Sequence, residues 1–153
     1  MRAAVNVTEI DAVISEIYIA ASPEVVFAYF VEADKMVRWM GSRVVDVDPR
    51  PGGAYAFDIN AMVRARGQYV EVVPHSRVVF SFGWEDDQSV PPSSSTVEVT
   101  LTPERDGTHV RLVHRGLQTA EMRQQHAHGW QLYLARLRTA GEGGDPGPDP
   151  NSQ

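Results

Sequence analysis

The sequence contains no cysteine among its 153 residues. This absence excludes disulfide bonds, zinc sites built on thiolates and a cysteine nucleophile, and it agrees with a reducing, cytoplasmic compartment. Lysine occurs only once, at Lys35, and the formal net charge is −6. Because nucleic-acid binding depends on clustered lysine and arginine, we expect no nucleic-acid partner.

Long apolar runs are also missing. No stretch of about 18 apolar residues is present, so we expect no membrane span. Residues 1–12 include Glu9 and Asp11, where a signal peptide would be apolar, and we interpret them as an N-terminal extension of a cytoplasmic protein. The sequence has no glycine-rich phosphate loop, no Ser–His–Asp order and no paired-carboxylate motif, so a named catalytic constellation is not supported.

The clearest predicted element is a helix over Glu121–Ala140. Its inward face recurs at steps of three and four residues and extends for about 30 Å; it consists of Met122, His126, Trp130, Tyr133, Leu134 and Leu137. Thr119 is expected to cap its start. Gly129 interrupts it at a cost of about 1 kcal/mol relative to alanine, so we expect a tertiary reason for the glycine. Either a strand approaches closely there, or a ligand needs the space, which is the explanation we favour.

The rest of the chain predicts an α+β domain over residues 13–140. Alternation indicates a first strand over Val13–Ile19, and Ser22-Pro23-Glu24 then begins a helix that continues to about Ala33. A second short helix, capped by Asp34, is expected to reach Trp39 or Met40. From Ser42 onward a period of two with frequent turn signals predicts six antiparallel strands.

Residues 141–153 are rich in glycine and proline and contain almost no apolar side chains. Such a segment cannot offset the entropy lost on ordering. We therefore predict a disordered tail whose deletion changes the melting temperature little.

Several short motifs follow one another in a characteristic order. They are AASPEVVF at 20–27, Trp39, PGG at 51–53, GQYVEVVP at 67–74, GT at 107–108 and HAHGW at 126–130. Together they resemble the family related to the C-terminal domain of the activator of the heat-shock-protein-90 ATPase, within the START-like (SRPBCC) helix-grip superfamily. The family often has tryptophan where this sequence has Phe27 and Phe82, and both positions remain aromatic.

The resemblance covers residues 14–140 and implies the order β-α-α-β6-α. In this helix-grip fold a curved antiparallel sheet is wrapped around a long C-terminal helix, commonly with an apolar cavity between them. Members of the superfamily include lipid carriers, polyketide cyclases and co-chaperones. The resemblance therefore implies the fold and leaves the activity open.

Aromatic residues supply the candidate walls of such a cavity. Apolar pockets with a few polar tips are typical small-molecule sites, although a solid core uses the same residue types. The residues expected to face inward or lie near the cavity mouth are Trp39, Tyr55, Phe57, Phe80, Phe82, Trp84, His114, His126, Gly129, Trp130 and Tyr133. We hypothesise that they bind a hydrophobic small molecule such as a lipid, a polyketide or an aromatic metabolite.

Two residues are weaker candidates for acid–base catalysis. His114 has the inward parity of its strand and could act near neutral pH, or it could be a hydrogen-bonded core residue. Glu71 would pair with an arginine or have a raised pKa if it faced inward. Its parity stays open because Gly67 is expected to mark a bulge.

We expect neither a metal nor another cofactor. His126 and His128 lie about 200° apart around a helix and cannot ligate one ion together. Two alternatives to small-molecule binding remain, namely a module that interacts with a chaperone and an enzyme of the polyketide cyclase or hydrolase type. We expect a monomer or a weak dimer.

Overall fold

The structure is a computed structural model that describes residues 12–152. The expected N-terminal extension lies outside the described residues apart from Ala12. The elements are β1 (Ala12–Ile19), α1 (Pro23–Val31), α2 (Ala33–Trp39), β2 (Arg43–Val47), β3 (Ala54–Asp58), β4 (Arg64–Val73), β5 (Arg77–Phe82), β6 (Ser95–Glu104), β7 (Gly107–Arg115) and α3 (Ala120–Gly141). This order confirms the predicted α+β helix-grip fold.

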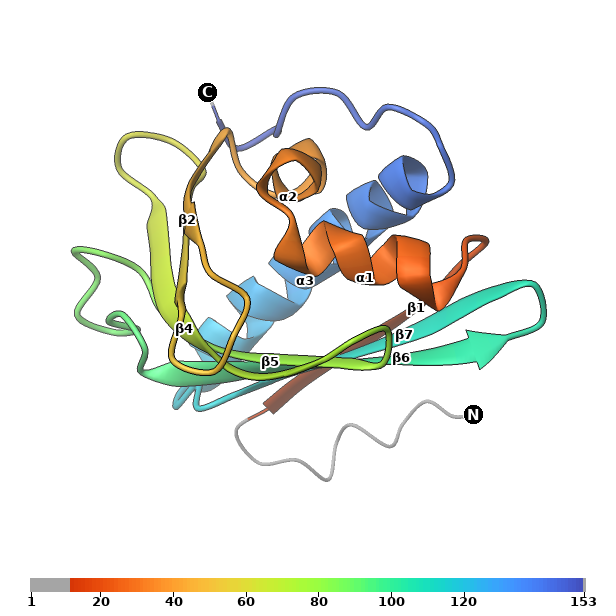
Figure 1. Ribbon diagram of the computed structural model, residues 1–153. Coiled ribbons are helices and arrows are strands. Elements are labelled where there is room, and N and C mark those ends of the chain that lie inside the picture. Colours follow the sequence, from red (N-terminus) through yellow and green to blue (C-terminus); the bar gives the residue numbers. More distant parts are fainter. Residues whose placement is uncertain (1–11, 153) are drawn as a thin grey trace.

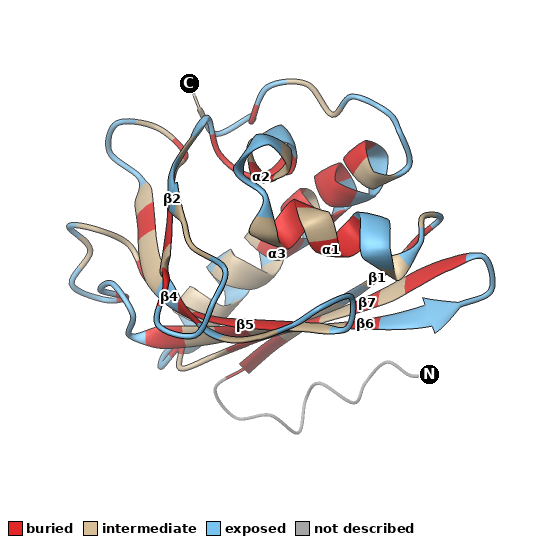
Figure 2. Ribbon diagram, in the orientation of Figure 1, coloured by how far each residue is buried: buried red, intermediate tan, exposed pale blue. Residues whose placement is uncertain are grey.

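The strands form one antiparallel sheet in the order β1-β7-β6-β5-β4-β3-β2. Strands β2 to β7 form a meander, and β1 pairs with β7 at the other edge. The sheet curves, and α1, α2 and α3 all lie on its concave side (Figure 1). Helix α1 is buried or half-buried apart from its exposed first turn, whereas α2 buries one side and exposes the other (Figure 2). No helix in the part of the chain that the structure describes is long and apolar enough to cross a membrane.

The helix starts follow local capping chemistry. The Ser22 hydroxyl accepts a hydrogen bond from the backbone N–H of Val25, and the Thr119 hydroxyl accepts one from that of Met122. Helix α2 differs from the prediction, because it begins at Ala33 without a side-chain cap rather than after Asp34.

The bulge in β4 lies further along the strand than the sequence predicted. Gly67 pairs regularly with Tyr55, and the register shifts between Tyr69 and Glu71 instead. Val70 is therefore the extra residue, and it is 54% exposed while Tyr69 is buried. Gly67 is required for a different reason, because a Cβ atom there would lie 1.9 Å from the carbonyl oxygen of Ser81 in β5.

The segment after α3 has a defined course, which differs from the disorder expected from its composition. It turns back past α2 and ends near the start of β2 (Figure 1). The buried guanidinium of Arg136 donates hydrogen bonds of 2.9–3.2 Å to the carbonyl oxygens of residues 146–148. The Asp149 carboxylate, only 3% exposed, accepts a 2.8 Å hydrogen bond from the Tyr133 hydroxyl. Polar contacts hold this segment, and a composition argument based on apolar burial does not detect them.

Candidate ligand-binding pocket

A pocket of about 680 Å³ lies between α3, strand β3 and the end of β5. A volume of this size is typical of small-molecule sites. Its inner walls are formed mainly by Met40, Phe57, Ile59, Phe82, Trp84, His126, Gly129, Trp130 and Tyr133. Its rim comes from two loops, one after β3 and one after β5, together with Gln125 of α3 and Asn151 of the tail.

Gly129 lies where α3 faces this space. A Cβ atom built on Gly129 would meet no atom within 4 Å, apart from neighbouring helix backbone. Close packing of a strand therefore does not explain the glycine. The position agrees with the expectation that Gly129 borders an open space.

His114 of β7 is fully buried behind the pocket wall, and both of its ring nitrogens are hydrogen-bonded. The indole N–H of Trp130 donates to Nδ1 at 3.0 Å. Nε2 therefore carries the proton and donates to the Ser95 hydroxyl at 2.8 Å, which in turn donates to the carbonyl oxygen of Phe82 at 2.7 Å. The chain of donors fixes the neutral form of His114 and the orientation of the Trp130 ring.

A second tryptophan–histidine pair stands beside the first. The indole N–H of Trp84 donates to Nε2 of His126 at 3.1 Å, and Nδ1 of His126 donates to the carbonyl oxygen of Met122 at 2.8 Å. The rings of His114 and His126 meet edge to face with centroids 5.2 Å apart. The two pairs connect β7 and the segment after β5 to α3, and their members Trp84, His126 and Trp130 form part of the aromatic wall of the pocket.

The environment of His114 opposes acid–base catalysis. Burial, with a smaller contribution from nearby His126, lowers its pKa from 6.5 to about 3. A protonated ring would also point an Nδ1–H at the indole N–H of Trp130. His114 is thus a hydrogen-bonded core residue, the second of the two roles considered for it.

Glu71, the other catalytic candidate, lies away from the pocket. The bulge at Val70 places it on the outer face of β4, where its side chain is 47% exposed and pairs with Arg77 at 3.1 Å. It is a solvated surface residue. The pocket therefore receives no acid–base group from either candidate.

The tail completes one side of the pocket. Tyr133 donates its hydroxyl proton to Asp149, and burial is the main cause that raises the pKa of the Tyr133 phenol. The side-chain amide of Asn151 donates to the Tyr133 oxygen at 3.1 Å, and the Asn60 amide donates to the carbonyl oxygen of Asn151 at 3.0 Å. Asp149 also accepts the backbone N–H of Gly41 at 2.8 Å. The segment thus links α3 to the loop before β4.

The structure divides the predicted ligand-binding residues into two groups. Those that line the pocket are Phe57, Phe82, Trp84, His126, Gly129, Trp130 and Tyr133. Trp39, Tyr55, Phe80 and His114 lie in the packed core instead. The Trp39 indole donates to the carbonyl oxygen of Tyr29 at 2.9 Å, and Tyr55 stacks on Phe80 with ring centroids 4.1 Å apart.

Sequence reasoning did not identify the residues of the rim. Residues 85–88 line the mouth, as do Asn60, Met62 and Val63, and none of them is among the residues expected to face a cavity. Loop residues have no periodicity that indicates which way they face. For residues 85–88 the available signal was their position directly after Trp84 in the sequence.

No cluster of three or more histidine, aspartate or glutamate side chains suited to a metal ion occurs within residues 12–152. The pocket is lined by aromatic rings and two methionines, and its rim carries three carboxylates.

Comparisons with known proteins place this fold among relatives. A family model described as Activator of Hsp90 ATPase homolog 1-like protein matches residues 20–142. The chain is similar to the solution structure of an AHSA1-like protein from Rhizobium etli, with 44% identity over 91% of this chain and 86% of that chain and a TM-score of 0.72. A search of curated proteins finds no match.

Two more distant structures share the fold. A crystal structure of a Chromobacterium violaceum protein is 24% identical over 86% of this chain and 97% of that chain, with a TM-score of 0.76. The solution structure of the Aha1 dimer from Colwellia psychrerythraea is 20% identical over 87% of this chain and 97% of that chain, with a TM-score of 0.75.

Proposed function

Because the chain belongs to the family of Activator of Hsp90 ATPase homolog 1-like proteins, whose helix-grip fold places a long helix over a curved sheet, we propose that it binds a hydrophobic small molecule. The ligand occupies the pocket of about 680 Å³ between α3 and strands β3 and β5. The observation that carries this proposal is Gly129, where a helix interior contains a glycine that faces open space.

The chemistry of the walls supports the same proposal. Phe82, Trp84 and Trp130 present ring surface to the pocket, and their positions are fixed by packing and by the two tryptophan–histidine hydrogen bonds. Rigid aromatic walls lose little conformational entropy when a ligand binds. Apolar ligands with flat rings therefore fit the site better than flexible polar ones.

The test is a titration of the protein with neutral flavonoids, polyketides and sterols, and with fatty acids. Binding should shift the amide NMR signals of residues 80–84 and 129–137 and change tryptophan fluorescence. The variant Gly129→Leu should abolish these changes by filling the pocket. The variant His128→Leu is the matched control, because it adds the same side chain at an exposed neighbouring position of α3.

Two outcomes would contradict the proposal. One is that no ligand shifts signals along these two segments. The other is that Gly129→Leu binds as well as the wild type, because the ligand would then lie outside the pocket.

The family assignment supports a second candidate, which is interaction with a chaperone. A purified heat-shock-protein-90 homologue should then retain the chain in a pull-down, and its ATPase rate should rise. Retention and stimulation that survive Gly129→Leu would separate this activity from the pocket. For the enzyme alternative, neither His114 nor Glu71 supplies the required group, because one has both ring nitrogens occupied and the other lies on the outer face.

A further inference from the structure

Hydrogen-bond donors and acceptors are distributed unevenly around the pocket. Each aromatic lining residue with a polar tip donates its proton into the protein. Trp84 donates to His126, Trp130 donates to His114, and Tyr133 donates to Asp149. The rings are therefore available to a ligand, whereas their N–H and O–H groups are not.

The amide groups on the tail side are occupied in the same way. The Nδ2 of Asn60 donates to the carbonyl oxygen of Asn151, and its Oδ1 accepts the backbone N–H groups of Met62 and Val63. The Nδ2 of Asn151 donates to the hydroxyl oxygen of Tyr133. Apart from the solvent-exposed amides of Gln88 and Gln125, these residues offer a ligand few donors.

Acceptors, in contrast, are concentrated at the mouth. Glu85, Asp86 and Asp87 follow Trp84 directly and all three line the pocket, and no arginine or lysine does so within residues 12–152. An ionised carboxylate has about four lone-pair sites, so partial pairing leaves it able to accept more hydrogen bonds. A cation beside Trp84 would also meet the negative face of an indole ring.

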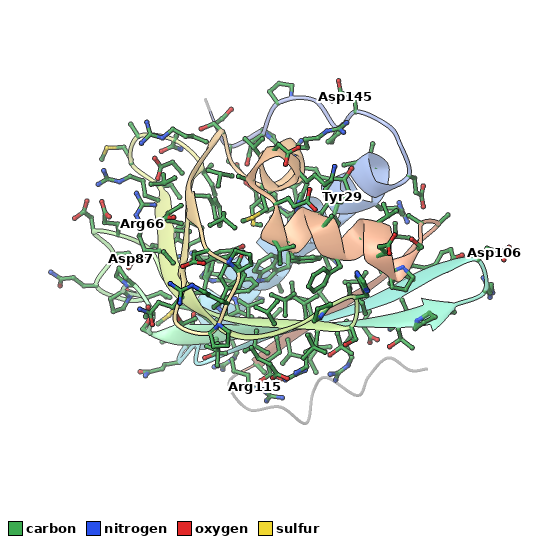
Figure 3. All side chains as sticks on the ribbon, in the orientation of Figure 1. Tyr29, Arg66, Asp87, Asp106, Arg115 and Asp145 are labelled. Carbon is green, nitrogen blue, oxygen red and sulfur yellow. The ribbon has the colours of Figure 1, made fainter. Side chains whose placement is uncertain are left out.

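The neighbouring arginines lie outside the pocket lining. Arg64 pairs with Glu85 and Asp86 at 2.9 and 2.8 Å, and Arg66 pairs with Glu85 at 3.2 Å. Figure 3 shows Arg66 and Asp87 on the same side of the molecule. Asp87 has no ion pair within the described residues, and its Oδ1 accepts the backbone N–H groups of the loop at Ser89 and Val90. The arginines thus hold Glu85 and Asp86 in place, and all three acidic residues line the mouth of the pocket.

We propose that the pocket selects aromatic ligands that carry a protonated amine at the end facing Glu85, Asp86 and Asp87, and that it discriminates against carboxylates. This inference rests on the proposed function and specifies its ligand class. The ring system lies against Trp84 and Trp130, and the ammonium group donates to the carboxylates of the mouth. An anionic ligand finds no arginine or lysine in the pocket lining and lies beside Asp87, whose charge no ion pair offsets within residues 12–152.

The experiment uses three probes with the same ring system and different ends, namely pyrenemethylamine, pyrenemethanol and pyrenecarboxylate. Affinities are measured by fluorescence titration at low ionic strength and neutral pH. Because partly exposed ion pairs have modest strength, we expect the amine to bind about fivefold more tightly than the alcohol. The carboxylate should bind more weakly than the alcohol. Salt at about 0.5 M should reduce the preference for the amine, since it screens charges within a few ångströms.

The variants test where the preference arises. Asp87→Asn and the double change Asp86→Asn with Asp87→Asn should lower the ratio of amine to alcohol affinity toward one. The asparagine Oδ1 at position 87 can still accept the loop N–H groups that Asp87 accepts. The control is Asp106→Asn, which alters the net charge equally at the opposite end of the sheet (Figure 3). It should leave the ratio unchanged.

The outcomes separate this inference from the function on which it rests. Binding of the alcohol without preference for the amine, or a preference that survives both aspartate variants, overturns the amine selectivity and leaves hydrophobic binding intact. Tighter binding of the carboxylate overturns the selectivity as well. If none of the three probes binds, the proposed function and the selectivity both fail.

Discussion

Replacing Gly129 offers the most direct test of whether the space beside α3 is real. A glycine inside a helix costs about 1 kcal/mol relative to alanine. A Cβ at this position would meet nothing within 4 Å, so Gly129→Ala introduces no clash. We therefore expect the alanine variant to be more stable by about 1 kcal/mol, which corresponds to a rise of roughly 2 to 4 °C in Tm for a domain of this size.

Leucine at the same position extends further into the pocket. Its side chain would replace empty space and contact the aromatic wall near Trp130. Burying part of a leucine contributes about 1 kcal/mol, in addition to the relieved helix penalty. Gly129→Leu should therefore be at least as stable as the wild type while it prevents ligand binding.

Thermal melts and urea denaturation of both variants measure these effects. The control His128→Ala tests whether a change in helix propensity alone raises stability, because His128 lies on the exposed side of α3. If alanine and leucine both destabilise, in order of size, Gly129 is required by close packing. Overpacking of that kind costs about 1 to 3 kcal/mol.

Three further predictions concern the residues around the pocket. Because the pKa of His114 falls from 6.5 to about 3 on folding, the unfolded chain binds more protons, and stability should decrease by up to about 1.4 kcal/mol per pH unit as the pH drops below 6.5. Urea denaturation between pH 7 and pH 5 should show a shallower dependence for His114→Gln, and equal slopes would contradict the assignment. Trp130→Ala should lower the free energy of unfolding in chemical denaturation by about 3 to 5 kcal/mol, since it removes a large buried ring and leaves His114 Nδ1 without its donor. A loss below about 1 kcal/mol would refute that role. Deleting residues 145–153 removes the acceptor of Tyr133 and the three tail carbonyl acceptors of Arg136, and it should lower the free energy of unfolding by about 2 to 4 kcal/mol. An unchanged Tm would show that the tail contacts contribute nothing.

The fold could be predicted because its signals are local. Alternation along β6 places Val97, Val99 and Leu101 on one face whatever the partner strand is, and the capping groups Ser22 and Thr119 act on N–H groups only three residues away. The resemblance of the ordered motifs supplied the arrangement of these elements in space. The aromatic wall of the pocket was also partly predictable. Alternation along the predicted strand places Phe82 and Trp84 on its inward face, and the helical repeat places Trp130 on the inward face of its helix.

Tertiary structure decided the features that depend on distant groups. The bulge is at Val70 rather than Gly67 because strand register is set by pairing with β5, and Gly67 is required by a carbonyl oxygen of Ser81. The tail is ordered through hydrogen bonds from Arg136 to backbone carbonyls, which leave no hydrophobic pattern in the sequence.

The same limit applies to the pocket itself. Tyr55 and Phe80 have the same inward parity as Phe57 and Phe82, yet the first two stack in the core and the other two border open space. Parity determines which face of a strand a side chain occupies. Whether another side chain fills the space in front of it depends on the course of α3 and of the loops, and those are fixed only when the whole chain has folded.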